Sequence, residues 1–481
     1  MDNFNKNNLV KLPNLILILG LINILFVYLT KQNIWISDDY PYIFGTKIYN
    51  LINEQKFYFF STQENRFIPL YWFITQFIPT NYLIWHSLVV FFYFLSSLVI
   101  YFLTIKLTKN LSISFLTSIF YTLNYSISIK ALSWAVFFGH VFNAFLGFLS
   151  ILIFLKIYEN NKKLIFVISF FIISLLNFLI TEGALIYPLI CLSIYLCIYR
   201  LKFHGIIISI VPLLIYILIV FSYTGKFLPL LIDRIEIDRE RINNNNFNKS
   251  SNTSLYHYRS TYAPRNLEGY TIRIFDNISA SINLSSIENS FKELDKNKKV
   301  EEIIKNNFKA FVFIFSFSLI IIIFFVAKFL KIIDKPKNYK SIIFIYLITL
   351  LIYSIIFFRR DINFGLSFIS SLLISKILYD LYRLKHKLII TLILFLYITP
   401  TILFAASNFK FFGDFSRQKS ISLFLEYEAN IAFNKPNREI DEYNDFKYFY
   451  YFNNFDDNKD YLKKYKNLTL REFFVEFNKN E

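Results

Sequence analysis

The sequence predicts an all-α, polytopic membrane protein with about 11 transmembrane helices, each reaching the length that crosses a bilayer. Of its 481 residues, 55% are hydrophobic and 20% are aromatic. A soluble domain of this length rarely carries so much Phe, Ile and Leu. Apolar runs of about 20 residues recur along the chain, which is the length of a membrane-spanning helix. The loops between these runs alternate between short basic ones and longer ones.

The predicted spans follow one another along the whole first four-fifths of the chain. They begin near Leu9, Tyr82, Leu111, Trp134, Leu164, Ala184, Gly205, Ala310, Ser341, Gly365 and Leu388. The first span is preceded by Lys6 but has a long apolar run with no small-residue cleavage site after it, so we expect a retained helix rather than a signal peptide. The boundary between the third and fourth spans is blurred by Asn124 and Lys130.

The short basic loops predict the orientation of the chain in the membrane. Lys and Arg are enriched in cytoplasmic loops, so these loops are assigned to the cytoplasm. They contain Lys106 and Lys109; Lys156, Lys162 and Lys163; Arg200 and Lys202; Lys331, Lys335, Lys337 and Lys340; and Arg383, Lys385 and Lys387. We therefore expect a cytoplasmic N-terminus and an outer C-terminus, in what looks like a bacterial inner membrane with a periplasmic C-terminal side. The net charge of +17 is explained by these loops, and no nucleic-acid partner is predicted.

Two parts are expected. Residues 1–406 form the transmembrane bundle, including a long first outer loop, 31–80, and the largest outer loop, 225–308. Residues 407–481 form a small C-terminal extracytoplasmic segment. The absence of a strong internal repeat argues against a transporter built from inverted halves. Cys191 and Cys197 share one apolar span and point in different directions, so they predict core packing and no disulfide. No cofactor and no metal site is predicted.

The residues most able to carry chemistry begin with Asp38 and Asp39, just after the first span. Crowded carboxylates raise the pKa of one of them. A carboxylate with a raised pKa at the mouth of a membrane bundle suits a general base that takes a proton from a hydroxyl. The alternative is a helix terminus, where Asp is favoured as a cap.

Two further candidates lie in outer turns. Arg66 precedes Pro69 in an aromatic segment of the first outer loop, where it could bind phosphate or snorkel to the interface. Glu182 lies in a very short turn between the fifth and sixth spans, so it must lie at the bundle mouth. An acid between apolar spans is costly unless it is paired or faces water, which makes it a site candidate or an ion-pair partner.

Arg359 and Arg360 are predicted at the outer end of the ninth span, against the usual charge bias. Guanidinium groups bind phosphate oxygens in a bidentate manner, so an anionic ligand is the simplest explanation. The alternatives are lipid headgroups or an ion pair with Asp361. His140 is interpreted as a hydrogen-bonded bundle residue. The basic residues Lys226, Arg259, Arg265 and Arg273 of the largest outer loop add only general positive potential.

In their order and position these motifs resemble the GT-C class of membrane glycosyltransferases, with protein O-mannosyltransferases and lipid A aminoarabinose transferases as the nearest branches. In that class an acidic pair follows the first span, as Asp38 and Asp39 do, here followed by Tyr40. An Arg-x-x-Pro-Leu type segment precedes the second span, as at residues 66–70. A Lys-Glu type dipeptide lies between spans five and six, where this chain has Thr181-Glu182. Two departures are Asp39, where Glu is commoner, and Thr181, which replaces a basic residue.

The resemblance implies a GT-C-like bundle and an inverting reaction in the lipid bilayer. A sugar would move from a polyprenyl-phosphate donor to a hydroxyl acceptor, which is a glycan, a lipid or a protein, on the outer side. Asp38 would be the base, and Asp39 or Glu182 would be a second acid that orients acceptor or sugar. Glu182 and Tyr40 would orient acceptor or sugar. The donor phosphate would be bound by Arg359, Arg360 and Arg66.

Two other functions stay open on the sequence. An O-antigen-type polymerase or ligase also has many spans, a large outer loop and functional arginines in that loop. It typically lacks an acidic pair after the first span, so its activity would depend on the loop arginines and not on Asp38. A lipid-linked sugar flippase or other transporter would carry polar residues at mid-membrane depth.

Overall fold

The computed structural model describes the helical framework of the chain. The described residues are 12–30, 68–75, 77–78, 82–124, 135–159, 164–198, 203–225, 227, 270, 273–274, 277–278, 280–281, 336–355, 363–391, 393–394 and 397. Within them, 93% of residues are helical and none is in a strand. The all-α class predicted from composition is therefore confirmed for the described part.

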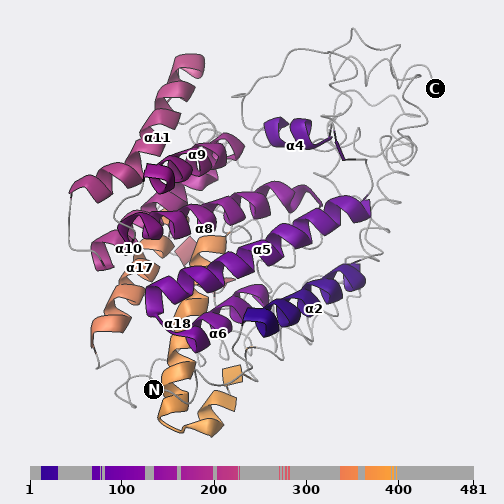
Figure 1. The fold of residues 1–481 in the computed structure, drawn as a ribbon, viewed down its shortest axis with the longest axis vertical. Coiled ribbons are helices and arrows are strands. Elements are labelled where there is room, and N and C mark those ends of the chain that lie inside the picture. Colours follow the sequence, from indigo (N-terminus) through magenta and orange to yellow (C-terminus); the bar gives the residue numbers. More distant parts are fainter. Residues whose placement is uncertain are drawn as a thin grey trace, which may run out of the picture.

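The helices lie in one bundle (Figure 1). The α-helices are α2 (Leu12–Thr30), α4 (Ile68–Thr75), α5 (Tyr82–Thr108), α6 (Leu111–Thr122), α8 (Phe138–Glu159), α9 (Leu164–Ile180), α10 (Ile186–Ile198), α11 (Phe203–Thr224), α17 (Pro336–Ile355) and α18 (Phe364–Arg383). Two 3₁₀ helices, η4 (Ala135–Phe137) and η5 (Glu182–Leu185), precede α8 and α10.

Four of the described helices are long and apolar enough to cross a membrane. These segments are Leu83–Thr108, Phe138–Tyr158, Gly205–Ser222 and Phe364–Arg383. Shorter apolar helices lie in α2, α6, α9, α10 and α17. The chain is thus an integral membrane protein by the length and composition of its helices. The span predicted near Ala310 lies outside the described residues, and the total of about 11 spans stays a prediction.

Apolar side chains on the outer faces of the bundle fit this assignment. Leu17 and Leu21 of α2, Leu164 of α9 and Leu218 of α11 are all more than half exposed. Large exposed apolar surfaces are rare on soluble monomers, whereas lipid tails solvate them. The interior is formed mainly by aromatic and aliphatic side chains of α5, α8, α10, α17 and α18.

The pair α5 and α6 shows how the sequence shapes the bundle. Lys109 adopts the left-handed conformation (φ 54°) between the two helices. The side-chain oxygen of Asn110 then accepts a hydrogen bond from the backbone nitrogen of Ile113 at 3.1 Å, which caps α6. Farther along, Ser118 donates to the carbonyl oxygen of Ser97 at 2.6 Å. The two helices are therefore antiparallel neighbours joined by small hydroxyl residues.

Helix α6 is shorter than the predicted third span. It ends at Thr122, and Asn124 after it donates hydrogen bonds to the carbonyl oxygens of Ala280 and Ser281 at 3.4 and 3.1 Å. The polar side chain that blurred the boundary in the sequence thus ends the helix inside the bundle. Helix α8 likewise begins at Phe138, because the 3₁₀ turn η4 occupies the residues just after the predicted start at Trp134.

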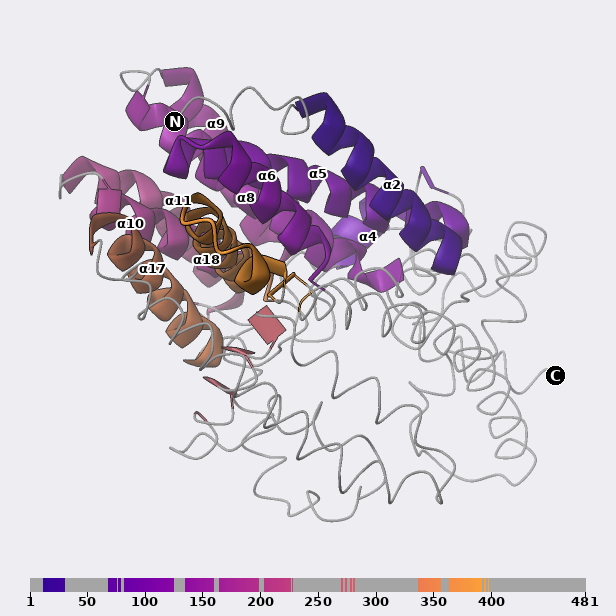
Figure 2. The same cartoon turned by 90° about the horizontal axis from the view of Figure 1, so that it is seen from below.

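Helices α8 and α9 form a second antiparallel pair in the bundle, which Figure 2 shows turned by 90°. The side-chain nitrogen of Asn143 donates to the side-chain oxygen of Asn177 at 2.6 Å, and both residues are buried. Toward the other end of the pair, the rings of Phe154 and Phe170 are 5.5 Å apart. Cys191 is buried in α10 and makes no disulfide, as predicted from its position in an apolar span.

Close packing of α8 and α10 depends on one glycine. A Cβ atom added at Gly147 would lie 2.4 Å from ring atoms of Tyr187, a residue 2% exposed. No real side chain fits at that distance, so the ring of Tyr187 occupies the space that a larger residue would need.

We predict that Gly147→Ala lowers the free energy of unfolding by about 1–3 kcal/mol, because the added methyl group overpacks the interface between α8 and α10. The measurement is thermal or denaturant unfolding of the full chain in detergent. Gly20→Ala is the matched control. No atom lies within 4 Å of its Cβ position in α2, so it should instead raise stability by about 0.5–1 kcal/mol through helix propensity. Equal effects of the two substitutions would contradict the packing argument.

Candidate functional site at one end of the bundle

Most of the predicted site residues lie outside the described residues. These are Asp38, Asp39, Tyr40, Arg66, Arg359 and Arg360. Glu182 is described in its backbone only, as the first residue of η5. Their roles therefore stay predictions, and the structure instead locates the helix ends to which they are connected.

The helices beside these residues can be oriented from ring and side-chain contacts. Trp85 of α5 packs against Phe138 of α8 with ring centroids 6.0 Å apart, and Phe92 packs against Phe145 at 5.5 Å, so the two helices run parallel. Because α9 is antiparallel to α8, the turn η5 lies at the end where α5 and α8 begin. Glu182 is therefore at a mouth of the bundle, as the sequence predicted for its backbone position.

Two more helix ends lie at this same end. Tyr101, late in α5, packs with Leu15 and Leu19 early in α2, so the last residues of α2 lie near the first residues of α5 (Figure 1). At the start of α18, a Cβ atom on Gly365 would lie 2.9 Å from Ile190 near the start of α10, so the start of α18 lies beside the residues that follow η5. We call this end the motif end. The chain leaves α2 here before Asp38 and enters α18 here after Arg360.

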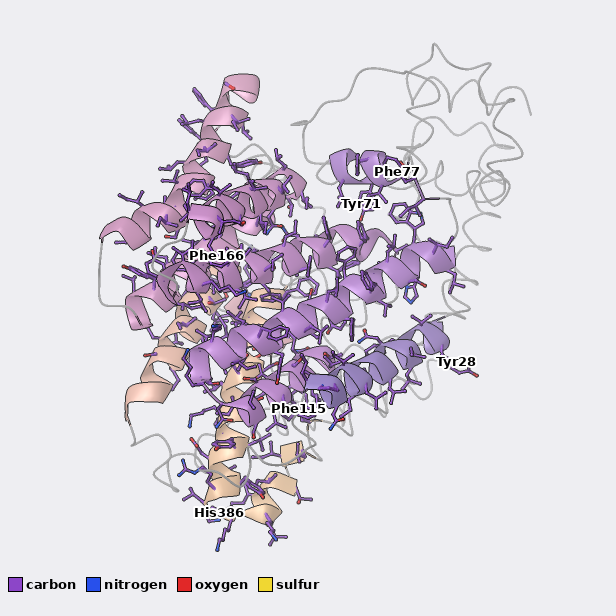
Figure 3. The ribbon with its side chains drawn as sticks, viewed as in Figure 1. Tyr28, Tyr71, Phe77, Phe115, Phe166 and His386 are labelled. Carbon is purple, nitrogen blue, oxygen red and sulfur yellow. The ribbon has the colours of Figure 1, made fainter. Side chains whose placement is uncertain are left out.

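Helix α4 fixes the chain just after Arg66. Tyr71 is fully buried, and its hydroxyl oxygen accepts a hydrogen bond from the backbone nitrogen of Gly139 at 3.0 Å. Its ring stacks on Trp85 at 5.8 Å. In Figure 3, Tyr71 extends from α4 toward the start of α8. Helix α4 begins at Ile68, two residues after Arg66 in the sequence, so the described chain resumes at the motif end just after this motif.

The turn that carries Glu182 is held by its neighbours in α8 and α9. Thr181 accepts a hydrogen bond at its side-chain oxygen from the backbone nitrogen of Gly183 at 3.2 Å. Its own backbone nitrogen donates to the carbonyl oxygen of Asn177 at 3.3 Å. Asn177 is in turn bound by Asn143. Thr181 therefore caps the N-terminus of η5. A hydroxyl suits this role, whereas the Lys expected from the GT-C resemblance does not.

A cluster of buried polar side chains at the motif end was not predicted. It consists of Arg273, Asn277, Ser281, Ser354 and Asn363, which are at most 3% exposed, and we call it the Asn277 cluster. Asn277 donates to the side-chain oxygen of Ser354 at 3.1 Å and accepts a hydrogen bond from the side-chain nitrogen of Asn363. These bonds join the segment around residue 277 to the end of α17 and the start of α18.

Ser281 extends the connection to the end of α6 and adds hydrogen bonds to α17 and α18. Its carbonyl oxygen accepts hydrogen bonds from Ser370 of α18 at 2.5 Å and from Asn124 at 3.1 Å, and its hydroxyl is 3.0 Å from that of Tyr346. The sequence placed this segment in the largest outer loop. The structure shows that its described residues, 270–281 with gaps, are helical and packed among α6, α17 and α18.

A signal for this segment was present in the sequence. Arg273, Asn277 and Ser281 recur at intervals of four residues, so they share one face of a helix. Ile274 and Ile278 repeat beside them. Polar residues at helical spacing with apolar neighbours predict a buried helix with a polar face, but the basic and Asn-rich composition of the surrounding loop obscured the pattern.

Arg273 gives the cluster its charge. It is 1% exposed, and its guanidinium lies 5.4 Å from the ring centroid of Tyr270, a cation–π distance. It is one helical turn from Asn277, which is bonded to Asn363, three residues after Arg360. A guanidinium in this setting can bind an oxyanion in a bidentate manner. His140, by contrast, is half-buried with its ring 5.1 Å from that of Phe137, as expected of a bundle residue.

Comparisons with known proteins give no relative for this chain. No protein-family model matches the sequence, no curated protein matches it, and no solved structure matches its fold.

We predict that Asn277→Ala lowers the free energy of unfolding by about 1–3 kcal/mol, because it removes both bonds of Asn277 and leaves buried polar groups of two helices unsatisfied. A double-mutant cycle with Ser354→Ala should show a coupling energy of about 0.5–3 kcal/mol. The measurement is unfolding of the full chain in detergent. Ser222→Ala, at an exposed hydroxyl of α11 that bonds only within its own helix, is the control and should change the stability by less than about 0.5 kcal/mol. Strictly additive effects of the two cluster substitutions would contradict the observed bond.

Proposed function

We propose that the chain is a membrane glycosyltransferase that moves a sugar from a polyprenyl-phosphate donor to a hydroxyl acceptor on the outer side of the membrane. The observation that carries the proposal is the common location of four helix ends. The end of α2, the start of α4, the turn η5 and the start of α18 share the motif end, and each adjoins one motif of the GT-C resemblance. Each of these motifs is therefore adjacent in sequence to a helix end in this region.

The proposed reaction is an inverting substitution at the anomeric carbon. The acceptor oxygen attacks this carbon while the bond from the carbon to the phosphate oxygen breaks, and polyprenyl phosphate leaves. Asp38 takes the proton of the acceptor hydroxyl as general base. Asp39 acts as the second acid, and Glu182 and Tyr40 orient acceptor and sugar. Positive groups stabilise the charge that develops on the departing phosphate, which is the role of Arg66, Arg359 and Arg360.

The Asn277 cluster supports the phosphate part of this proposal. It fixes Asn363 three residues after Arg360, in a hydrogen-bonded environment away from lipid. Binding energy directed at a developing charge is greatest where the donors are held in place beforehand. Arg273 adds a buried positive charge at the same end of the bundle.

The proposed location is a bacterial inner membrane with the motif end facing the periplasm. Lys106, Lys109 and Lys156 lie at the opposite ends of α5, α6 and α8, where the positive-inside rule expects the cytoplasm. Arg383 ends α18 on that side as well. The N-terminus would then be cytoplasmic and the C-terminus periplasmic, and donor and acceptor would meet at the outer leaflet of the bilayer.

One observation favours a second candidate, an O-antigen-type polymerase or ligase. Such enzymes depend on arginines of their large outer loop, and Arg273 is a buried arginine of that region. The two candidate functions differ in the residue on which activity most depends. The first requires Asp38, and the second requires Arg273 with little contribution from Asp38.

We predict that Asp38→Asn lowers the transfer rate by about 10²–10⁴-fold, because a general base contributes on that order. Arg360→Ala should raise the KM for the donor more than Asp38→Asn does. The measurement is the acceptor-dependent release of polyprenyl phosphate from a panel of polyprenyl-phosphate hexoses and pentoses, which does not require the sugar to be known.

Asp380→Asn is the matched control. Asp380 is a carboxylate at the far end of α18, where it forms an ion pair with Lys376. Its removal should leave the rate unchanged. Full activity of Asp38→Asn together with loss of activity in Arg273→Gln would refute the glycosyltransferase mechanism and favour the polymerase or ligase.

A further inference from the structure

A line of serines along α18 makes none of the hydrogen bonds that buried hydroxyls normally make. Ser367, Ser371 and Ser375 recur at intervals of four residues on one side of the helix, and each is fully buried. Their hydroxyl oxygens have no hydrogen-bond partner in the described part of the structure. The same holds for the side-chain oxygen of Asn363, which begins the line.

Some buried hydroxyls elsewhere in the bundle are satisfied by a carbonyl oxygen of their own helix. Ser97 donates to the carbonyl oxygen of Tyr93 at 3.1 Å, and Thr117 donates to that of Ile113 at 2.7 Å. This bond to the residue four positions earlier is the usual way for a hydroxyl to be satisfied in an apolar helix. Ser367, Ser371 and Ser375 lack this bond in the described part of the structure.

Helix α6, which packs against α18, brings unsatisfied hydroxyls of its own. The hydroxyl of Tyr121 and that of Ser112 are buried, and neither has a hydrogen-bond partner among the described residues. The end of α6 lies near the start of α18, since Asn124 and Ser370 share the carbonyl oxygen of Ser281. Tyr121 therefore belongs to the Asn363 end of the contact, and Ser112 belongs to the Ser375 end.

We propose that ordered water molecules form a file between α6 and α18 and hydrogen-bond to Ser367, Ser371 and Ser375. A buried hydroxyl without a partner is costly, and more so where lipid surrounds the bundle. Buried water makes about three hydrogen bonds at such sites and is part of the structure. The line from Asn363 to Ser375 extends about 18 Å along α18 at 1.5 Å per residue.

This file would connect two charged regions. The Asn277 cluster lies at one end, through Asn363. At the other end, Lys376 and Asp380 form an ion pair at 2.5 Å in the next turns of α18. The inference does not depend on the proposed chemistry, because it rests on the hydroxyls of two helices alone.

X-ray radiolysis of the full chain in ¹⁸O-labelled water tests the proposal. Radicals formed from bound water oxidise the side chains beside it, and the incorporated ¹⁸O is read by mass spectrometry. We expect Phe368, Leu372 and Tyr121 to be modified at least fivefold faster than Phe138. All four are at most 3% exposed, but Phe138 is surrounded by the rings of Tyr71, Trp85, Phe92 and Phe142.

The variant Ser367→Ala/Ser371→Ala/Ser375→Ala should reduce the modification of Phe368 and Leu372 to the rate of Phe138. Ser193→Ala, at a serine of α10 that donates to the carbonyl oxygen of Leu189 in its own helix, should leave their modification unchanged. If the triple variant does not fold, the wild-type rates decide alone. Equal rates at Phe368, Leu372, Tyr121 and Phe138 in the wild type would overturn the proposal and show that the contact is dry.

Discussion

The carbonyl oxygen of Ser281 accepts hydrogen bonds from two helices that are distant in sequence, and the described motif end of the bundle depends on this junction. Asn124 reaches it from the end of α6, and Ser370 reaches it from α18. The hydroxyl of the same residue lies within hydrogen-bond distance of Tyr346 in α17. Three helices are thus held together through one residue of a segment that the sequence places in a loop. In an apolar bundle such bonds are specific, because an alternative pairing would leave polar groups without partners.

Hydrogen bonds and close packing also fix the position at which α18 begins. Asn363 precedes the helix and is bound to Asn277, and the backbone nitrogen of Gly365 donates to the hydroxyl of Tyr353 at 3.2 Å. Glycine at residue 365 permits close packing here, since a Cβ atom at this position would lie 2.9 Å from the side chain of Ile190. Asn363 and Gly365 are therefore fixed by polar bonds on one side and by close packing on the other.

The sequence predicted the apolar framework well and the polar interior poorly. Runs of apolar residues gave the starts of α5, α9 and α18 to within a residue, because a helix in lipid must be apolar along its length. The end of α6 and the start of α8 were less clear, since both depend on tertiary bonds and turns that hydropathy does not register. Of the candidate site, only the backbone of Glu182 could be compared, and its place at a bundle mouth follows from the shortness of its turn. The Asn277 cluster was missed because its members come from three elements, and the pairing of Asn277 with Asn363 has no signature in either segment alone.

The ring of Tyr187 seated over Gly147 has a mechanical consequence. The ring blocks sliding of α8 along α10, because such a movement would force it out of the space beside Gly147. Helix α9 is joined to α8 by the hydrogen bond between Asn143 and Asn177. Helices α8, α9 and α10 then move as one rigid unit. Any rearrangement of the bundle must therefore be accommodated at contacts other than the one between α8 and α10.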